Sequence, residues 1–189
     1  HTRWWFGTGV QTCALPISGG RVHYGNGKFV ATPDGWGFDG ISIFPTDNFD
    51  IVQHVELREL ATGIFFNDNK FYITCLFNNK VIIIDANDNK IQKIIEVEKE
   101  PYAIAFGSNR LAIANRKSND VKLFNMDGSG PTQTIPVGNR PISIAYGDGK
   151  FVVANSESDY VTMFNEDGTG KIVNIPVGNN PVAVAFSDW

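Results

Sequence analysis

The chain has 189 residues, of which 42% are hydrophobic and only 19% are charged, and its formal net charge is −4 at pH 7. This length suits one ordinary domain, and the apolar content is enough for a packed core, so a wholly disordered chain is excluded. The slightly acidic balance argues against a nucleic-acid partner, and no apolar run approaches the roughly 18 residues of a membrane-spanning helix.

The first 18 residues match nothing further along the chain. Within them, Gly9–Ile17 reads GVQTCALPI and resembles the translation of a DNA-sequencing adapter. We therefore expect residues 1–18 to be a non-native segment and leave them out of the fold prediction. Without Cys13, Cys75 is the remaining cysteine, so no disulfide framework is expected.

The rest of the chain is a tandem repeat with a period of about 40 residues. Pro101, Pro141 and Pro181 mark equivalent positions in three successive units. The units run over residues 19–60, 61–100, 101–140 and 141–180, with a partial fifth at 181–189. The first unit is two residues longer, and the extra pair falls in the loop that holds Trp36 and Phe38, which are expected to pack over the end of the unit.

Each unit contains four short runs of β-branched and aromatic residues, separated by turns rich in Gly, Asn and Asp. In the clearest unit these runs are Ile142–Tyr146, Phe151–Ala154, Tyr160–Phe164 and Ile172–Val177. Four strands repeating every 40 residues are typical of a β-propeller blade. The sequence therefore predicts an all-β fold with about four four-stranded blades. Because propellers usually close with about 4–8 blades and the last unit stops after one strand, we expect a fragment of a six- to eight-bladed propeller.

The last two units also resemble a known family. Ile135-Pro-Val-Gly-Asn-Arg-Pro141, Phe151-Val-Val-Ala-Asn155 and Ile175-Pro-Val-Gly-Asn-Asn-Pro181 are similar to the YVTN β-propeller repeat. The resemblance weakens in the earlier units, where Glu96 and Glu98 replace the usual Pro and Gly. It implies a bacterial or archaeal protein that is periplasmic, secreted or on the cell surface, and a role in binding or scaffolding. The family is also related to seven-bladed lactonase-like enzymes.

Few residues outside the repeat pattern suggest chemistry, and we predict no catalytic residues, no metal ligands and no cofactor. Cys75 has no Cys or His partner at metal-ligand spacing and is interpreted as a strand residue. His23 and His54 lie in different units. The segment Asp85–Asn89 has a spacing like that of a calcium loop, but Lys90 stands where that loop needs glycine, so we interpret it as a polar turn.

The candidate binding residues lie in loops that the repeat register brings to one face of the propeller. These loops precede the first strand or follow the second strand of each unit, and loops on a rigid scaffold commonly carry function. The predicted ligand-binding residues are Asn115, Arg116, Asn139, Arg140, Asn155 and Asn179.

Two functions of different classes are consistent with this sequence. The first is a non-catalytic scaffold or binding module for a protein, glycan or surface partner. The second is a propeller enzyme of lactonase or streptogramin-lyase type, with its metal site in blades beyond this chain. The lack of a catalytic constellation in these units favours the binding module.

Overall fold

The structure, a computed structural model, describes residues 22–32, 40–48, 50 and 52–187, and these residues form four separate antiparallel sheets of four strands each. The sheets correspond one to one to the predicted units, and we refer to them as blades 1 to 4. The strands of blades 1 and 2 are β1 (Val22–Gly25), β2 (Lys28–Ala31), β3 (Gly40–Pro45), β4 (Gln53–Glu56), β5 (Ala61–Asn67), β6 (Lys70–Cys75), β7 (Lys80–Asp85) and β8 (Ile91–Glu96). The strands of blades 3 and 4 are β9 (Pro101–Phe106), β10 (Arg110–Asn115), β11 (Asp120–Asn125), β12 (Gln133–Pro136), β13 (Pro141–Gly147), β14 (Lys150–Asn155), β15 (Tyr160–Asn165) and β16 (Val173–Pro176).

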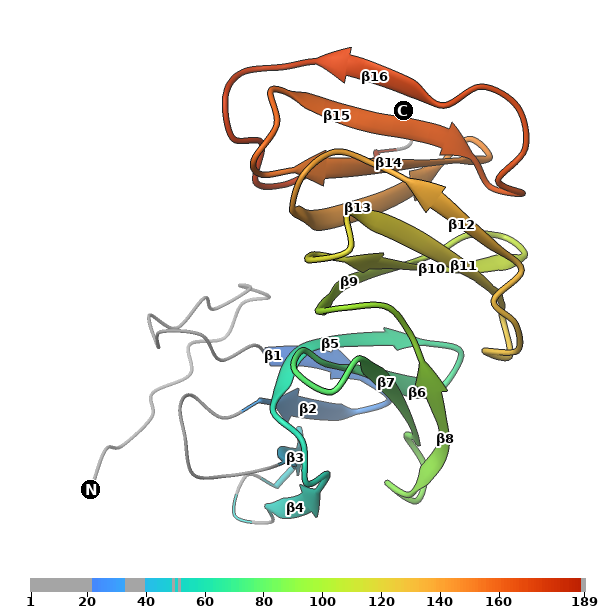
Figure 1. Ribbon diagram of the computed structural model, residues 1–189. Coiled ribbons are helices and arrows are strands. Elements are labelled where there is room, and N and C mark those ends of the chain that lie inside the picture. The colour runs from blue at the N-terminus through green and yellow to red at the C-terminus, as the bar shows by residue number, and fades with distance from the viewer. Residues whose placement is uncertain (1–21, 33–39, 49, 51, 188–189) are drawn as a thin grey trace.

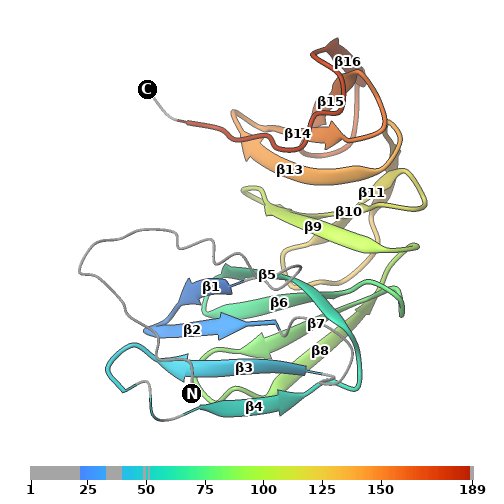
Figure 2. The same ribbon diagram turned by 90° about the vertical axis from the view of Figure 1, so that its left-hand side faces the viewer.

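Within each blade the strands follow one another as simple hairpins, so strand order in the sheet equals strand order in the chain. The first strands of neighbouring blades lie next to one another, and the blades fan out from them in an open arc (Figures 1 and 2). Pro101 and Pro141 occupy the first position of β9 and β13, where a missing N–H costs no ladder bond. The predicted all-β fold with four-stranded blades is thus confirmed.

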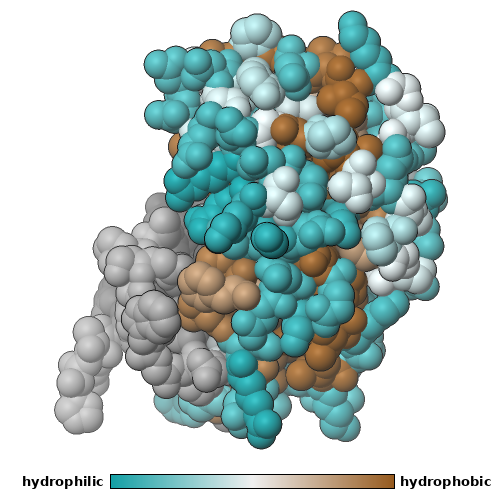
Figure 3. All heavy atoms as spheres, in the orientation of Figure 1, coloured by the Kyte–Doolittle hydropathy of each residue, from teal (hydrophilic) through white to brown (hydrophobic). Residues whose placement is uncertain are grey.

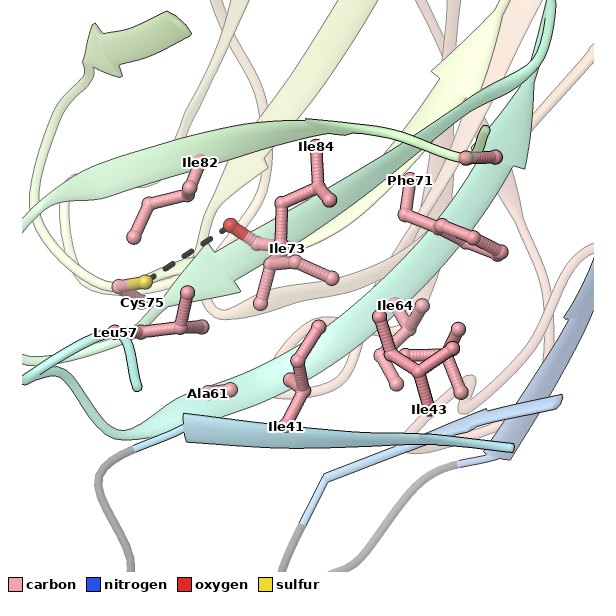
Figure 4. Close-up of a cluster of buried hydrophobic side chains, with 12 residues drawn as sticks. Ile41, Ile43, Leu57, Ala61, Ile64, Phe71, Ile73, Cys75, Ile82 and Ile84 are labelled. Atoms are coloured by element: carbon pink, nitrogen blue, oxygen red, sulfur yellow. Dashed lines mark hydrogen bonds between the residues drawn. The ribbon is translucent and has the colours of Figure 1, made fainter. Parts of the chain in front are cut away.

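The hydrophobic core lies between the blades rather than within them. One buried cluster joins blades 1 and 2 through side chains such as Ile41 and Ile43 on one side and Ile64, Phe71 and Ile73 on the other (Figure 4). Two further clusters join blade 2 to blade 3 and blade 3 to blade 4. Because each face is buried only by a neighbouring blade, stability depends on stacking, as in other repeat architectures.

The turns follow the predicted positions. Asp85 and its neighbours form the turn between β7 and β8, where the Asp85 carboxylate accepts a hydrogen bond from the Asn87 backbone N–H at 2.7 Å. Asp127 and Asp167 act in the same way in the β11–β12 and β15–β16 loops, where they accept bonds from the amides of Ser129 and Thr169. The expectations for residues 1–18 and for Trp36 and Phe38 lie outside the described residues.

Candidate functional site

One end of the stacked blades carries the loops that were predicted to bind a ligand. We call this end the loop face. It consists of the segments between blades (98–100, 138–140 and 178–180) and the loops after each second strand (76–79, 116–119 and 156–159). The inter-blade segment leading into blade 4 is tied to both blades, since the N–H of Val137 donates to the Asn119 carbonyl at 3.1 Å and the N–H of Ser156 donates to the Arg140 carbonyl at 2.9 Å. Backbone bonding of this kind makes the loop face a rigid platform.

Among the described residues, four ion pairs involve the loop face, and two of them have opposite polarity in blades 3 and 4. In blade 3, the Arg116 guanidinium donates to one Glu100 carboxylate oxygen from Nη2 at 2.7 Å and from Nε at 2.9 Å. In blade 4, Arg140 occupies the register position of Glu100 and pairs with Glu157 at 2.6 Å. The charged groups are therefore matched locally, and the loop face carries both signs rather than a single-sign patch.

The six predicted binding residues fall into two groups. Asn139, Arg140 and Asn179 are exposed, and Arg116 is half-buried, with its guanidinium 5.4 Å from the centre of the Tyr102 ring. Asn115 and Asn155 are fully buried at the ends of β10 and β14. The structure thus brings four of the six to the surface of the loop face and places the other two beneath it.

The two buried asparagines hold their blades together at the edge of the loop face. The Asn155 side-chain amide donates to the Tyr160 carbonyl at 3.2 Å and to the Thr162 hydroxyl at 3.0 Å. Asn115 instead donates to the Asp120 carboxylate at 2.7 Å. The Oδ1 atoms of both asparagines are buried without a hydrogen-bond partner, and such atoms are uncommon in folded proteins.

Phe77 is a loop-face residue that the sequence reasoning missed. It is 58% exposed, among the most exposed large hydrophobic residues that the structure describes. In the repeat register it is equivalent to Lys117 and Glu157, which are also exposed. Comparing this one position across three blades reveals an apolar, a cationic and an anionic side chain, and that comparison could have identified Phe77 from the sequence.

Two titratable groups near the loop face have raised pKa values. Burial raises the pKa of Asp120, although its hydrogen bond from Asn115 opposes the shift. Burial also raises the pKa of the Cys75 thiol to about 12. Cys75 is 1% exposed and free, and its thiol faces the Ile73 carbonyl (Figure 4). Cys75 is also the last residue of β6, so the interpretation of it as a buried strand residue is supported.

The opposite end of the blades holds a cavity of about 470 Å³ between blades 3 and 4. Its polar lining includes Arg110, Glu166 and Asp167. Glu166 accepts hydrogen bonds from the backbone amides of Asn109 at 2.5 Å and Arg110 at 3.1 Å, and from the Tyr146 hydroxyl at 2.9 Å. One carboxylate oxygen thereby joins blade 4 to blade 3, and the other is bonded within blade 4.

Over the described part of the chain, no three His, Cys, Asp or Glu side chains come together as a metal site would require. In the same residues we find no helix with the length and apolar character needed to cross a membrane.

No protein-family model matches the chain, and neither does any curated protein. Several solved structures are similar in fold. A streptogramin B lyase matches 87% of this chain and 56% of its own, with a TM-score of 0.70 and 15% identity. Sqt1 of Saccharomyces cerevisiae matches 86% of this chain and 48% of its own, with a TM-score of 0.68 and 13% identity. The computationally designed Ika8 protein matches 88% of this chain and 52% of its own, with a TM-score of 0.67 and 13% identity. The chain spans about half the length of these three proteins, and by its fold it is a β-propeller repeat protein.

Proposed function

We propose that the chain is a non-catalytic β-propeller binding module whose loop face contacts a protein partner. The observation that carries this function is the single register position occupied by Phe77, Lys117 and Glu157, which exposes apolar, cationic and anionic groups on three neighbouring blades. A protein surface offers this mixture of chemistry, and an exposed aromatic residue is a common energetic anchor of protein interfaces. The exposed residues Asn139, Arg140 and Asn179 extend the same surface.

Asn115 and Asn155 take a supporting role in this function because they are buried beneath the loops. The backbone bonds that fix the loops favour binding, since a preorganised surface loses little conformational entropy when a partner docks. The likeness to the YVTN repeat favours a periplasmic, secreted or cell-surface setting for this module.

The alternative function is a propeller enzyme of lactonase or streptogramin-lyase type. The likeness of fold to a streptogramin B lyase is the observation in its favour. At 15% identity that likeness shows the fold alone. In the described residues, both carboxylate oxygens of the cavity residue Glu166 already accept hydrogen bonds, one from blade 3 and the other within blade 4. The binding module therefore fits the described residues better.

A displayed library of short random peptides tests the binding module directly. We expect peptides selected on the full chain to lose binding at least tenfold in the variants Phe77→Ser and Lys117→Glu. The matched control is Ile91→Ser, which removes a 44% exposed apolar residue near the other end of blade 2. Selected peptides that bind the Phe77→Ser variant as well as the original chain would contradict the function, as would turnover of a streptogramin or a lactone by the chain.

A further inference from the structure

The outer strands of the four blades differ in how their free edges are protected. Among the described residues, β4, β8, β12 and β16 each pair with one neighbouring strand only. β12 and β16 are four residues long and end in Pro136 and Pro176, whereas β8 is six residues long and ends in Glu96. Short edge strands and prolines on an edge both hinder pairing with a further strand. Of the four edges, that of β8 is therefore the most open to an added strand.

The hydrogen bonds at the end of β8 show which of its backbone groups face outwards. The N–H of Val97 donates to the carbonyl of Asn79, directly before β7, at 2.9 Å. Backbone groups alternate in direction along an antiparallel strand, so those of Ile94 and Glu96 point away from β7. The same bonding in blade 3 places Pro136 on the free edge of β12, in the register of Glu96. Blade 2 thus keeps an outward N–H donor that the proline of blade 3 removes.

The side chains at these two positions of β8 are also particular to blade 2. Ile94 is 49% exposed. The other three blades have polar residues at its register position, namely His54, Thr134 and Asn174. Glu96 is exposed and makes no ion pair with any residue that the structure describes, whereas its blade 1 equivalent Glu56 pairs with Arg58 at 3.5 Å. Figure 3 shows hydrophobic side chains among the polar ones on the side of the lower blades where Figure 1 places β8.

We propose that the free edge of β8 binds an extended segment of a partner protein, which becomes a fifth strand of blade 2. The outward N–H and C=O groups of Ile94 and Glu96 pair with the backbone of an antiparallel strand. The side chains of these two residues lie on the same face of the sheet, since side chains alternate along a strand. The partner segment therefore places an apolar residue opposite Ile94 and a basic residue opposite Glu96. An acidic segment is rejected, because like charges directly across a strand pair repel.

An extended synthetic peptide of alternating valine and threonine residues, with one lysine in the register of Glu96, serves as the probe. Fluorescence anisotropy of the labelled peptide measures its binding to the full chain, which we expect to be saturable. An N-methyl group on the peptide residue that faces Ile94 should abolish binding, because the N–H of that residue points at β8. An N-methyl group on the next residue, which faces Ile95, should leave binding unchanged, because its N–H points away from the blade.

Variants of the chain test the same edge from the other side. Glu96→Pro introduces the residue that blades 3 and 4 have at this position, so the blade should fold as before. It should weaken peptide binding about tenfold, because a main-chain hydrogen bond and a charge pair are lost together. Glu96→Gln keeps the N–H and should weaken binding only about threefold. Glu56→Pro is the matched control, because it makes the same change at the equivalent position of blade 1, and it should leave binding unchanged.

Four results would overturn the proposal. The first is a peptide that does not bind the full chain, and the second is equal binding by the original chain and the Glu96→Pro variant. The third is an equal loss in Glu96→Pro and Glu96→Gln, because the charge alone would then explain the binding. The fourth is a dimer of the chain that Glu96→Pro dissociates without peptide, since a second copy would then occupy the edge. No variant in this test changes a loop-face residue, so its failure would leave the loop-face function untouched.

Discussion

Adding one methyl group at Gly138 should destabilise blade 4, whereas adding it at the equivalent Gly178 should not. A Cβ atom at Gly138 would lie 2.7 Å from Cγ and 2.8 Å from both Cβ and Nδ2 of the buried Asn155. Ordinary van der Waals contacts begin near 3.4 Å, so Asn155 or the Gly138 segment has to move. At Gly178 the same methyl group meets no heavy atom within 4 Å. Neither glycine has a positive φ, so alanine is conformationally permitted at both positions.

The magnitude follows from the contacts of Asn155. Overpacking of a buried site typically costs about 1–3 kcal/mol, and each hydrogen bond lost from Asn155 adds about 0.5–1.5 kcal/mol. Since the side chain can shift and keep one of its two bonds, we expect Gly138→Ala to lower the free energy of unfolding by about 2–3 kcal/mol. Gly178→Ala should leave it unchanged or raise it by about 0.5 kcal/mol, because the unfolded chain loses freedom.

Urea denaturation of the two variants measures these differences directly. The double variant Gly138→Ala/Asn155→Gly provides the internal control, because it removes Cβ, Cγ and Nδ2 of Asn155, the three atoms that the new methyl group would meet, and should make its loss smaller than the sum of the two single losses. Equal effects of Gly138→Ala and Gly178→Ala would refute the reasoning. Strictly additive losses in the double variant would show that Asn155 is not the obstacle.

Three further predictions concern buried groups. Because the pKa of Asp120 is raised, the unfolding free energy should fall as the pH rises from the ordinary value of 3.8 through the raised pKa. Asp120→Asn should remove this fall and be more stable than the original chain at pH 7 but not at pH 3, as urea titrations at the two pH values will show. Phe151→Ala should lower the free energy of unfolding by about 3–5 kcal/mol. Phe151→Leu should lower it by less than about 1.5 kcal/mol, because blade 3 has the buried Leu111 at the equivalent position. Calorimetry can rank the two variants. Cys75 should react with a thiol reagent only after urea unfolding, and peptide mapping distinguishes it from Cys13. Fast modification of Cys75 itself in the folded chain would contradict its burial.

The repeat pattern predicted the fold well because a blade leaves a strong signal in the sequence. The proline that begins the first strand of blades 3 and 4, the turn residues and the apolar runs recur together, so strand positions in one unit support those in the next. Pro101 and Pro141, for example, begin β9 and β13 as expected. Even Ala61, which replaces proline in blade 2, begins its strand at the equivalent position.

Side-chain direction at the loop face was harder to predict. The register correctly locates Asn115 and Asn155 at the ends of second strands, but it does not indicate which way their side chains point. In both blades the ladder shifts register near this residue, between Ala114 and Asn115 in one and between Pro141 and Ser143 in the other. A bulge of this kind re-aims a side chain. Phe77 was also overlooked. It stands out only when the equivalent position is compared across three blades, where the other two hold the charged residues Lys117 and Glu157.

The ion pairs Arg116–Glu100 and Arg140–Glu157 have opposite polarity, and this difference lets each inter-blade segment distinguish blade 3 from blade 4 during folding. Neighbouring repeats of similar sequence can exchange places during folding, which is a characteristic failure of repeat proteins. If the segment before blade 4 docked in blade 3, Arg140 would face Arg116 and Lys117 instead of Glu157. If the segment before blade 3 docked in blade 4, Glu100 would meet Glu157. Either slip of one repeat replaces an attraction with a repulsion, so the charges distinguish two blades that the hydrophobic pattern alone makes nearly interchangeable.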